Sequence, residues 1–217
     1  MKFQLSKQWI KSFLLMIVSV ICMGFGVSLL VLTKMGTDPC SAMNYGVAGK
    51  LGLSFGTYQL MFNAVLLLMV FVCKRSLIGT GTLGNMVLVG YSADFFGWLW
   101  RELFHIPAEL SLPVRIGILI PTLLIFVVAA ACYIHSGRGM APYDAVPFIL
   151  AEKIEKRFHK DWLFPIRVGE DLLAAVIGYV TGGEVGVMTV MMIVLLGSAI
   201  TCVGKLFKRW HILEKLA

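Results

Sequence analysis

Three ionisable residues interrupt an otherwise apolar stretch, "FPIRVGED", at residues 164–171. On a helix, Arg167 precedes Glu170 by three residues and Asp171 by four, so its guanidinium can pair with either carboxylate. If this stretch lies at membrane depth, its ionisable groups are expensive to hold there and are usually functional. Two interpretations stand: a structural ion pair, or a cluster that binds a substrate or a coupling ion.

Two similar segments, "GTDPCSAM" (36–43) and "GMAPYDAV" (139–146), each follow a long apolar run. Each pairs a flexible Gly with a Pro that lacks a backbone donor, which predicts a helix break followed by a new, short helix. Lipid cannot satisfy the backbone groups at such a break, so each must face protein or a water-filled cavity. The start of the new helix favours anions, but Asp38 and Asp144 are equally suited to cap it. Capping and substrate contact both remain open for these two residues.

Further polar residues lie within or at the ends of apolar runs, namely Asn44, Gln59, Asn63, Asn85 and Asp94. Asp94 is the most expensive to leave unpaired, and its partner is either Arg101 or a group on another helix. Our predicted substrate-binding set is Asp38, Pro39, Asp94, Pro142, Asp144, Arg167 and Glu170.

Motifs for catalysis and metal binding are missing. The sequence has no H-E-x-x-H, G-x-S-x-G, Walker A or nucleotide fingerprint, and its five Cys and four His are dispersed without ligand spacing. We therefore expect no enzyme activity, no cofactor and no metal.

The elements that position these residues are membrane helices. Of the 217 residues, 59% are hydrophobic and only 14% charged, against about 25% charged in soluble domains. Six apolar runs predict an all-α, multi-pass membrane protein with six transmembrane helices, the fifth of which needs residues 161–170 to reach spanning length. The runs are 12–33, 57–73, 83–100, 114–134, 171–181 and 185–204.

The segments after the two prolines, about 39–50 and 142–152, are predicted to be half-helices. If they crossed fully, the chain would have eight spans. Twelve helical residues cover only about 18 Å of a core of about 30 Å, which favours six spans.

The net charge of +7 follows the predicted topology rather than forming one basic patch. With both termini cytoplasmic, fourteen Lys and Arg lie on inner segments and four on outer ones, with Arg167 unassigned. This distribution predicts a cell-membrane protein and argues against nucleic-acid binding.

An internal repeat divides the chain into residues 1–110 and 111–217. "IGTGTLGNMVLVG" (78–90) aligns with "VGVMTVMMIVLLG" (185–197), in the same order relative to the Gly-Pro segments. Three spans per repeat would invert the second half, giving the 3+3 inverted repeat of many transporters. Chance similarity between Gly-rich apolar helices is the alternative. In "GYVTGGEVGVMT", the Gly182-Gly183 pair predicts a turn, and we expect packing rather than ligand contact from the glycines.

Several of these motifs, "GTDP", "IGTGTLGN", "APYDAV", "IRVGED" and "GGEVGVMT", together resemble the bacterial YczE-like membrane proteins of the YczE/YyaS/YitT family. The resemblance covers nearly the whole chain and implies an integral membrane protein without implying a particular activity. Ala141 and Met188 depart from the glycines usual in that pattern. The pattern's positions fall here on Pro39, Gly79, Thr82, Gly90, Asp94, Gly139, Pro142, Asp144, Arg167, Glu170, Gly182, Gly183, Gly186 and Thr189.

The function predicted from these features is a small transporter or exporter, with a small molecule or ion bound between the two repeats. Two alternatives remain: a substrate-binding subunit of a larger transporter, and a regulatory or assembly protein without transport activity. The expected partners are the lipid bilayer and either a second copy of the chain or another membrane protein.

Overall fold

The computed structural model describes residues 7–107, 109–159 and 162–209. Within those ranges every regular element is helical, which confirms the all-α prediction. The elements are α1 (Lys7–Thr33), α2 (Pro39–Leu51), α3 (Phe55–Cys73), η1 (Arg75–Leu77), α4 (Thr80–Gly84), η2 (Asn85–Val89), α5 (Gly90–Trp98), η3 (Leu99–Leu103), α6 (Leu112–His135), α7 (Pro142–Phe158), α8 (Leu163–Thr181) and α9 (Val187–Arg209).

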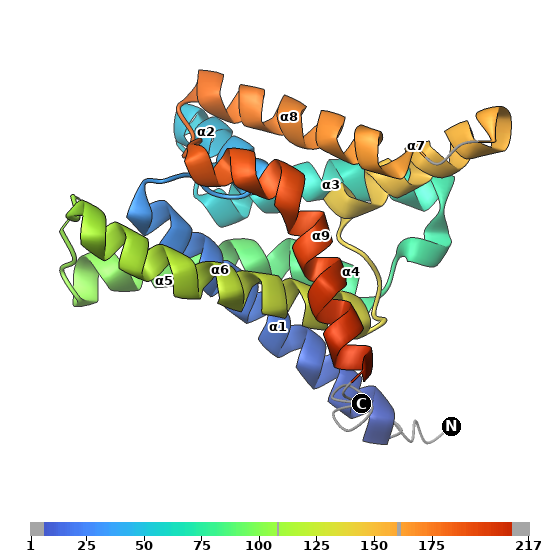
Figure 1. Ribbon diagram of the computed structural model, residues 1–217, viewed down its shortest axis with the longest axis horizontal. Helices are drawn as coiled ribbons and strands as arrows, with labels where there is room; N and C mark the ends of the chain where they lie inside the picture. Colours follow the sequence, from blue (N-terminus) through green and yellow to red (C-terminus); the bar gives the residue numbers. More distant parts are fainter. Residues whose placement is uncertain (1–6, 108, 160–161, 210–217) are drawn as a thin grey trace.

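The helices pack in pairs that join the two halves of the chain. α1 lies along α6, α2 packs on α8, and α3 packs on α7, while α9 crosses beside α6 (Figure 1). The start of α1 and the end of α9 lie at the same end of the molecule. An even number of membrane crossings between Lys7 and Arg209 is consistent with this arrangement.

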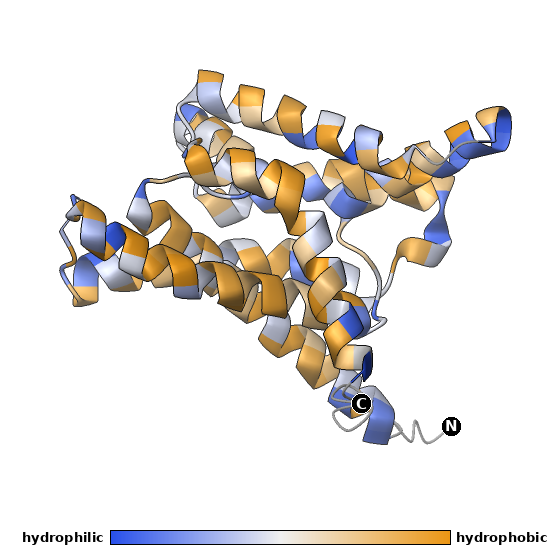
Figure 2. Ribbon diagram, in the orientation of Figure 1, coloured by the Kyte–Doolittle hydropathy of each residue, from blue (hydrophilic) through white to orange (hydrophobic). Residues whose placement is uncertain are grey.

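Four of the described helices are long and apolar enough to cross a membrane: Lys7–Thr33, Phe55–Cys73, Leu112–His135 and Val187–Phe207. The other two predicted spans are built differently. The region 80–103 is divided among α4, α5 and two π-helical turns, and α8 carries the three charged residues of "IRVGED" in its first half. Apolar residues make up most of the length of these helices (Figure 2), and many of their large apolar side chains are exposed. The chain is thus a multi-pass membrane protein.

Both Gly-Pro segments begin a new helix, as the sequence predicts. Pro39 and Pro142 each occupy the first turn of their helix, where the missing N–H has no intrahelical partner to lose. α2 has 13 residues, about 20 Å, and is capped by Gly52, which adopts the left-handed conformation with a φ of 67°.

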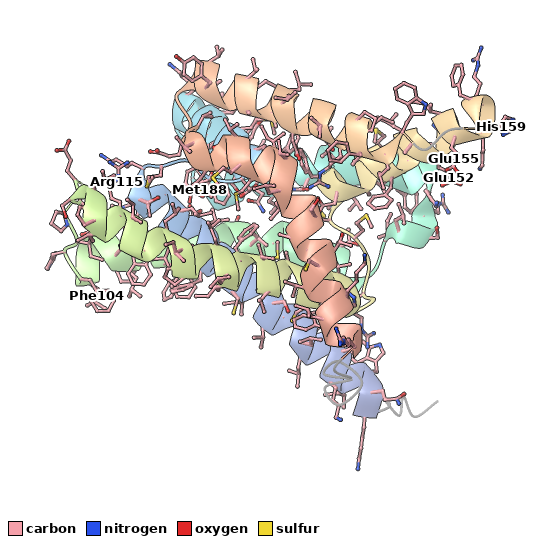
Figure 3. The ribbon with its side chains drawn as sticks, viewed as in Figure 1. Phe104, Arg115, Glu152, Glu155, His159 and Met188 are labelled. Atoms are coloured by element: carbon pink, nitrogen blue, oxygen red, sulfur yellow. The ribbon has the colours of Figure 1, made fainter. Side chains whose placement is uncertain are left out.

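α7 differs from the predicted half-helix at 142–152, because it continues to Phe158. Its final turns are charged and exposed, so water can solvate them without a lipid-facing surface (Figure 2). Glu152, Glu155 and His159 lie together at this far end (Figure 3). Lys74 and Lys156 donate to the Glu152 carboxylate, which ties the end of α7 to the residue after α3.

The turn between α1 and α2 crosses the turn between α8 and α9, at Gly36 and Gly186. The Thr37 N–H donates to the Glu184 carbonyl and the Met188 N–H to the Met35 carbonyl, each at 3.0 Å. A Cβ added at Gly186 would lie 2.3 Å from the Met35 oxygen, so only glycine allows this approach.

A second crossing at Gly139 and Gly79 is built in the same way. The Met140 N–H donates to the Leu77 carbonyl at 2.9 Å and the Gly81 N–H to the Arg138 carbonyl at 2.6 Å. A Cβ at Gly79 would lie 2.1 Å from the Arg138 oxygen.

At the starts of α4 and α9, a threonine hydroxyl oxygen accepts a hydrogen bond from the glycine N–H that precedes the helix. The Gly79 N–H donates to Thr82 Oγ1 at 3.0 Å, and the Gly186 N–H donates to Thr189 Oγ1 at 3.2 Å. The Gly-Thr motif found in both halves therefore has the same local role in each.

The glycines of "GYVTGGEVG" form a turn and close packing contacts, as predicted. Gly182 ends α8 in the left-handed conformation, with φ 84°. A Cβ at Gly178 would lie 2.9 Å from the Ala42 carbonyl carbon of α2, which places the two helix backbones in close contact. These small residues let α8 cover the buried face of α2.

Candidate functional site

A cavity of about 970 Å³ lies among α1, α2, α3, η1, η2, α6, α7, α8 and α9. One part of its wall is polar and the rest is mainly apolar, including Met23, Val27, Val89, Phe126 and Met192. The polar residues of the wall include Asp38, Cys40, Ser41, Gln59, Asn63, Asn85, Tyr143, Asp144, Arg167 and Asp171. Both halves of the chain contribute to it, so neither half forms the cavity alone.

Arg167 of α8 is the centre of a charged cluster in this wall. Its Nη1 lies 2.7 Å from Asp144 Oδ1 on α7, and its Nε lies 3.3 Å from Asp171 Oδ2 one turn along α8. Its guanidinium carbon lies 5.6 Å from the centroid of the Tyr143 ring, within the range of a cation–π contact. The guanidinium therefore bridges two aspartates, one on α7 and one on α8.

Tyr143 completes this cluster and was not among the residues predicted from sequence. Its hydroxyl donates to Asp171 Oδ1 at 2.8 Å. Asp171 is buried, and its two oxygens are thereby used by Tyr143 and Arg167. The only signal in the sequence was its place between Pro142 and Asp144 in the second Gly-Pro segment.

Asp38 has both a structural contact and a free oxygen. Its Oδ1 accepts a hydrogen bond from the Ser41 N–H at 3.0 Å, which is the predicted N-cap of α2. Its Oδ2 is buried and has no hydrogen-bond partner, although the side chain lines the cavity. Pro39 lines the same wall. Asp144 does not cap α7, since its carboxylate faces Arg167 instead.

The remaining predicted site residues lie elsewhere. Pro142 is fully buried at the start of α7, outside the cavity wall. Glu170 neighbours the cluster without lining the cavity, and its Oε2 is buried without a partner. Of its two possible helical partners, Arg167 therefore pairs with Asp171 and not with Glu170 among the described ion pairs.

Asp94 on α5 also lies away from the cavity wall. Its Oδ2 accepts a hydrogen bond from the Gly56 N–H at 2.8 Å, at the start of α3. Its partner is thus a group on another helix, which was one of the two predicted choices, and no ion pair with Arg101 occurs in the described part of the chain. A carboxylate at a helix N-terminus offsets the unsatisfied amides there.

Metal binding has no visible basis in this site. In residues 7–107, 109–159 and 162–209, no three His, Cys, Asp or Glu side chains gather in a way that could hold a metal ion.

Comparison with known proteins now identifies the family. A family model described as "Family of unknown function (DUF6198)" matches residues 10–205. The chain belongs to the DUF6198 family. This result confirms the resemblance to YczE-like membrane proteins inferred from the motifs.

Three relatives of this DUF6198 protein cover most of its length. It is 26% identical over 179 residues to the "Uncharacterized membrane protein YczE" of Bacillus subtilis (strain 168), covering 82% of this chain and 78% of the relative. It is 25% identical over 190 residues to an "Uncharacterized protein" of Haemophilus influenzae, covering 88% and 82%. It is 22% identical over 204 residues to "Uncharacterized protein YyaS" of Bacillus subtilis, covering 91% and 94%. No solved structure matches the chain.

Proposed function

We propose that this DUF6198 protein is a small transporter or exporter that binds a small solute in the cavity between its two halves. The observation that carries the proposal is the cavity itself: it is large, it is shared by both halves, and it holds ionisable groups among apolar helices. Ionisable groups at membrane depth usually mark a substrate or ion pathway. On this proposal the protein catalyses no chemical reaction.

The proposed architecture is a 3+3 inverted repeat with six spans and both termini cytoplasmic in a bacterial plasma membrane. The spans are α1, α3, the region 80–103, α6, α8 and α9, while α2 and α7 are half-helices. The matched hydrogen bonds of the two crossings support this proposal, since each backbone hydrogen bond of one crossing has a counterpart in the other. The packing of α2 on α8 and of α3 on α7 also supports it. In the proposed repeat α2 corresponds to α7 and α3 to α8, so these two helix pairs are equivalent.

Alternating access gives this proposal a direct test, because a transporter must open its cavity to both sides of the membrane. Cys40 is a half-buried native thiol in the cavity wall, and Cys73 is an exposed thiol at the end of α3. Two variants, each retaining one of these thiols and carrying alanine at the other four cysteines, form a matched pair.

Each variant is treated with a membrane-impermeant maleimide in right-side-out and in inside-out vesicles. We expect Cys40 to be labelled from both faces and Cys73 from the cytoplasmic face alone. Labelling of Cys40 from one face only would favour a substrate-binding subunit, and labelling from neither face would favour a regulatory or assembly protein.

A further inference from the structure

Two described residues of the cavity wall carry a buried hydrogen-bond acceptor that has no donor. In the described part of the chain, the buried side-chain atoms without a partner are all oxygens: Asp38 Oδ2, Asn44 Oδ1, Asn63 Oδ1 and Glu170 Oε2. Two of these side chains, Asp38 at 9% exposed and Asn63 at 3% exposed, line the cavity. A buried acceptor without a donor costs about 1–3 kcal/mol, so a ligand that supplies donors would be stabilised here.

Among the described residues, the buried part of the wall holds one carboxyl group without an ion pair, that of Asp38, whereas Lys205 is exposed. Arg167 is engaged by Asp144 and Asp171, and no ion pair of the described residues involves Asp38. Lys205, near the end of α9, is the other basic residue of the described cavity lining. The Ser41 amide donates to Asp38 Oδ1, and Asp38 Oδ2 is buried without a donor. The ligand favoured at this oxygen is therefore a cation with N–H donors.

The apolar part of the cavity wall favours a ligand that also has an apolar portion. Phe126, Met192 and Val27 line the same cavity, and the volume of about 970 Å³ lies at the upper end of the range for organic ligands. A bare metal ion would fill little of it. Aromatic rings near a cation add a further attraction, and Tyr143 already faces the Arg167 guanidinium in this way.

We propose that the cavity binds an organic ammonium ion, whose N–H groups donate to Asp38 Oδ2 and Asn63 Oδ1 and whose apolar body packs against Phe126 and Met192. The role of this ion as a transported substrate rests on the proposed function. Its binding does not, and can be measured in the purified chain.

The binding test uses 2-phenylethylammonium as the probe, with isothermal titration of the full-length protein in detergent and matched titrations into empty micelles. We expect saturable binding of this ion at pH 7. Three comparison compounds define the chemistry: 3-phenylpropionate reverses the charge, trimethyl(2-phenylethyl)ammonium keeps the charge without N–H donors, and sodium ion lacks the apolar body. Binding of any of the three as tight as that of the probe would overturn the proposal, as would no binding of the probe.

Variants locate the site. Asp38→Asn removes the charge while keeping an oxygen for the Ser41 amide, and we expect its affinity for the probe to fall roughly 10- to 100-fold, as for a lost charged hydrogen bond. Asn63→Leu removes the second acceptor at similar volume, should weaken binding roughly 3- to 10-fold, and serves as the test if Asp38→Asn does not fold. The control Glu155→Gln neutralises a carboxylate on the exposed end of α7 and should bind the probe unchanged (Figure 3). Unchanged affinity in both cavity variants would refute the assignment.

The two proposals fail in different ways. Labelling of Cys40 from both faces without ammonium binding would keep the transporter and overturn the ligand class. Ammonium binding with Cys40 labelled from one face would keep the ligand class and overturn transport.

Discussion

Replacing Gly79 by alanine is predicted to open one of the two crossings between the halves. The added Cβ would lie 2.1 Å from the Arg138 carbonyl oxygen, 2.7 Å from its carbonyl carbon and 3.1 Å from the Gly139 nitrogen. The neighbouring atoms are backbone, so no side chain can rotate away. Alanine can adopt the Gly79 φ of −152°. The predicted destabilisation therefore comes from the steric contact alone.

The size of the effect follows from the displacement needed. Restoring an ordinary contact requires about 1 Å of movement between the two turns, which separates the Gly81 N–H from the Arg138 carbonyl and the Met140 N–H from the Leu77 carbonyl. Each lost hydrogen bond costs about 1 kcal/mol and the remaining overpacking about 1–3 kcal/mol. The free energy of unfolding should fall by about 3–5 kcal/mol.

The assay is helix content by circular dichroism during a titration from mild detergent into sodium dodecyl sulfate. Gly117→Ala is the matched control, because nothing lies within 4 Å of a Cβ added at Gly117 on α6. Its unfolding free energy should exceed that of the parent protein by no more than about 1 kcal/mol, because alanine is more favourable than glycine within a helix. Equal midpoints for Gly79→Ala and Gly117→Ala would refute the reasoning.

Three further predictions concern charged contacts. Arg167→Met should lower the unfolding free energy by about 2 kcal/mol, since it leaves two aspartates without their cation, whereas Arg167→Lys should lose less; equal losses in the same titration would contradict this. Arg115 donates to the carbonyls of Thr33 and Lys34 at the end of α1 (Figure 3), so Arg115→Gln should lose about 1 kcal/mol, and an unchanged midpoint would argue against the contact. Hydrogen bonds from Lys74 and Lys156 lower the pKa of Glu152, so its contribution is present above the ordinary carboxyl pKa and lost as the pH falls through the lowered value. Glu152→Gln should therefore be less stable than the parent at pH 7 and equal to it well below pH 4, the range of an ordinary Glu, and a constant difference across that range would exclude the mechanism.

Local chemistry made much of the fold predictable. Pro39 and Pro142 mark helix starts because their backbone restriction acts within one turn, and Asp38 caps α2 for the same local reason. The pairing of Arg167 with Asp171 follows from helical spacing. The end of α7 was predicted too early. The charged turns up to Phe158 remain helical because they are exposed, so water solvates their side chains.

The site was predictable only in part, because it depends on contacts between distant segments. Asp144, Arg167 and Asp171 were singled out, but nothing in a sequence states that a carboxylate on α7 faces a guanidinium on α8. Tyr143 was missed for that reason. Asp94 shows the converse: its cost in the membrane was foreseen, yet its partner is a backbone amide of α3, and backbone donors leave no trace in the residue pattern.

The crossed turns have a consequence for how the chain is made. Backbone hydrogen bonds join residues 35–37 to residues 184–188 and residues 77–81 to residues 138–140. The turns of the first half therefore lack these partners until the second half has been synthesised. The helices of the first half thus enter the bilayer before the residues that complete these hydrogen bonds have been synthesised. The described residues of the connection between the halves, 104–107 and 109–111, take no part in these bonds. A gene divided within this connection should therefore yield two fragments that are each degraded alone and accumulate when expressed together.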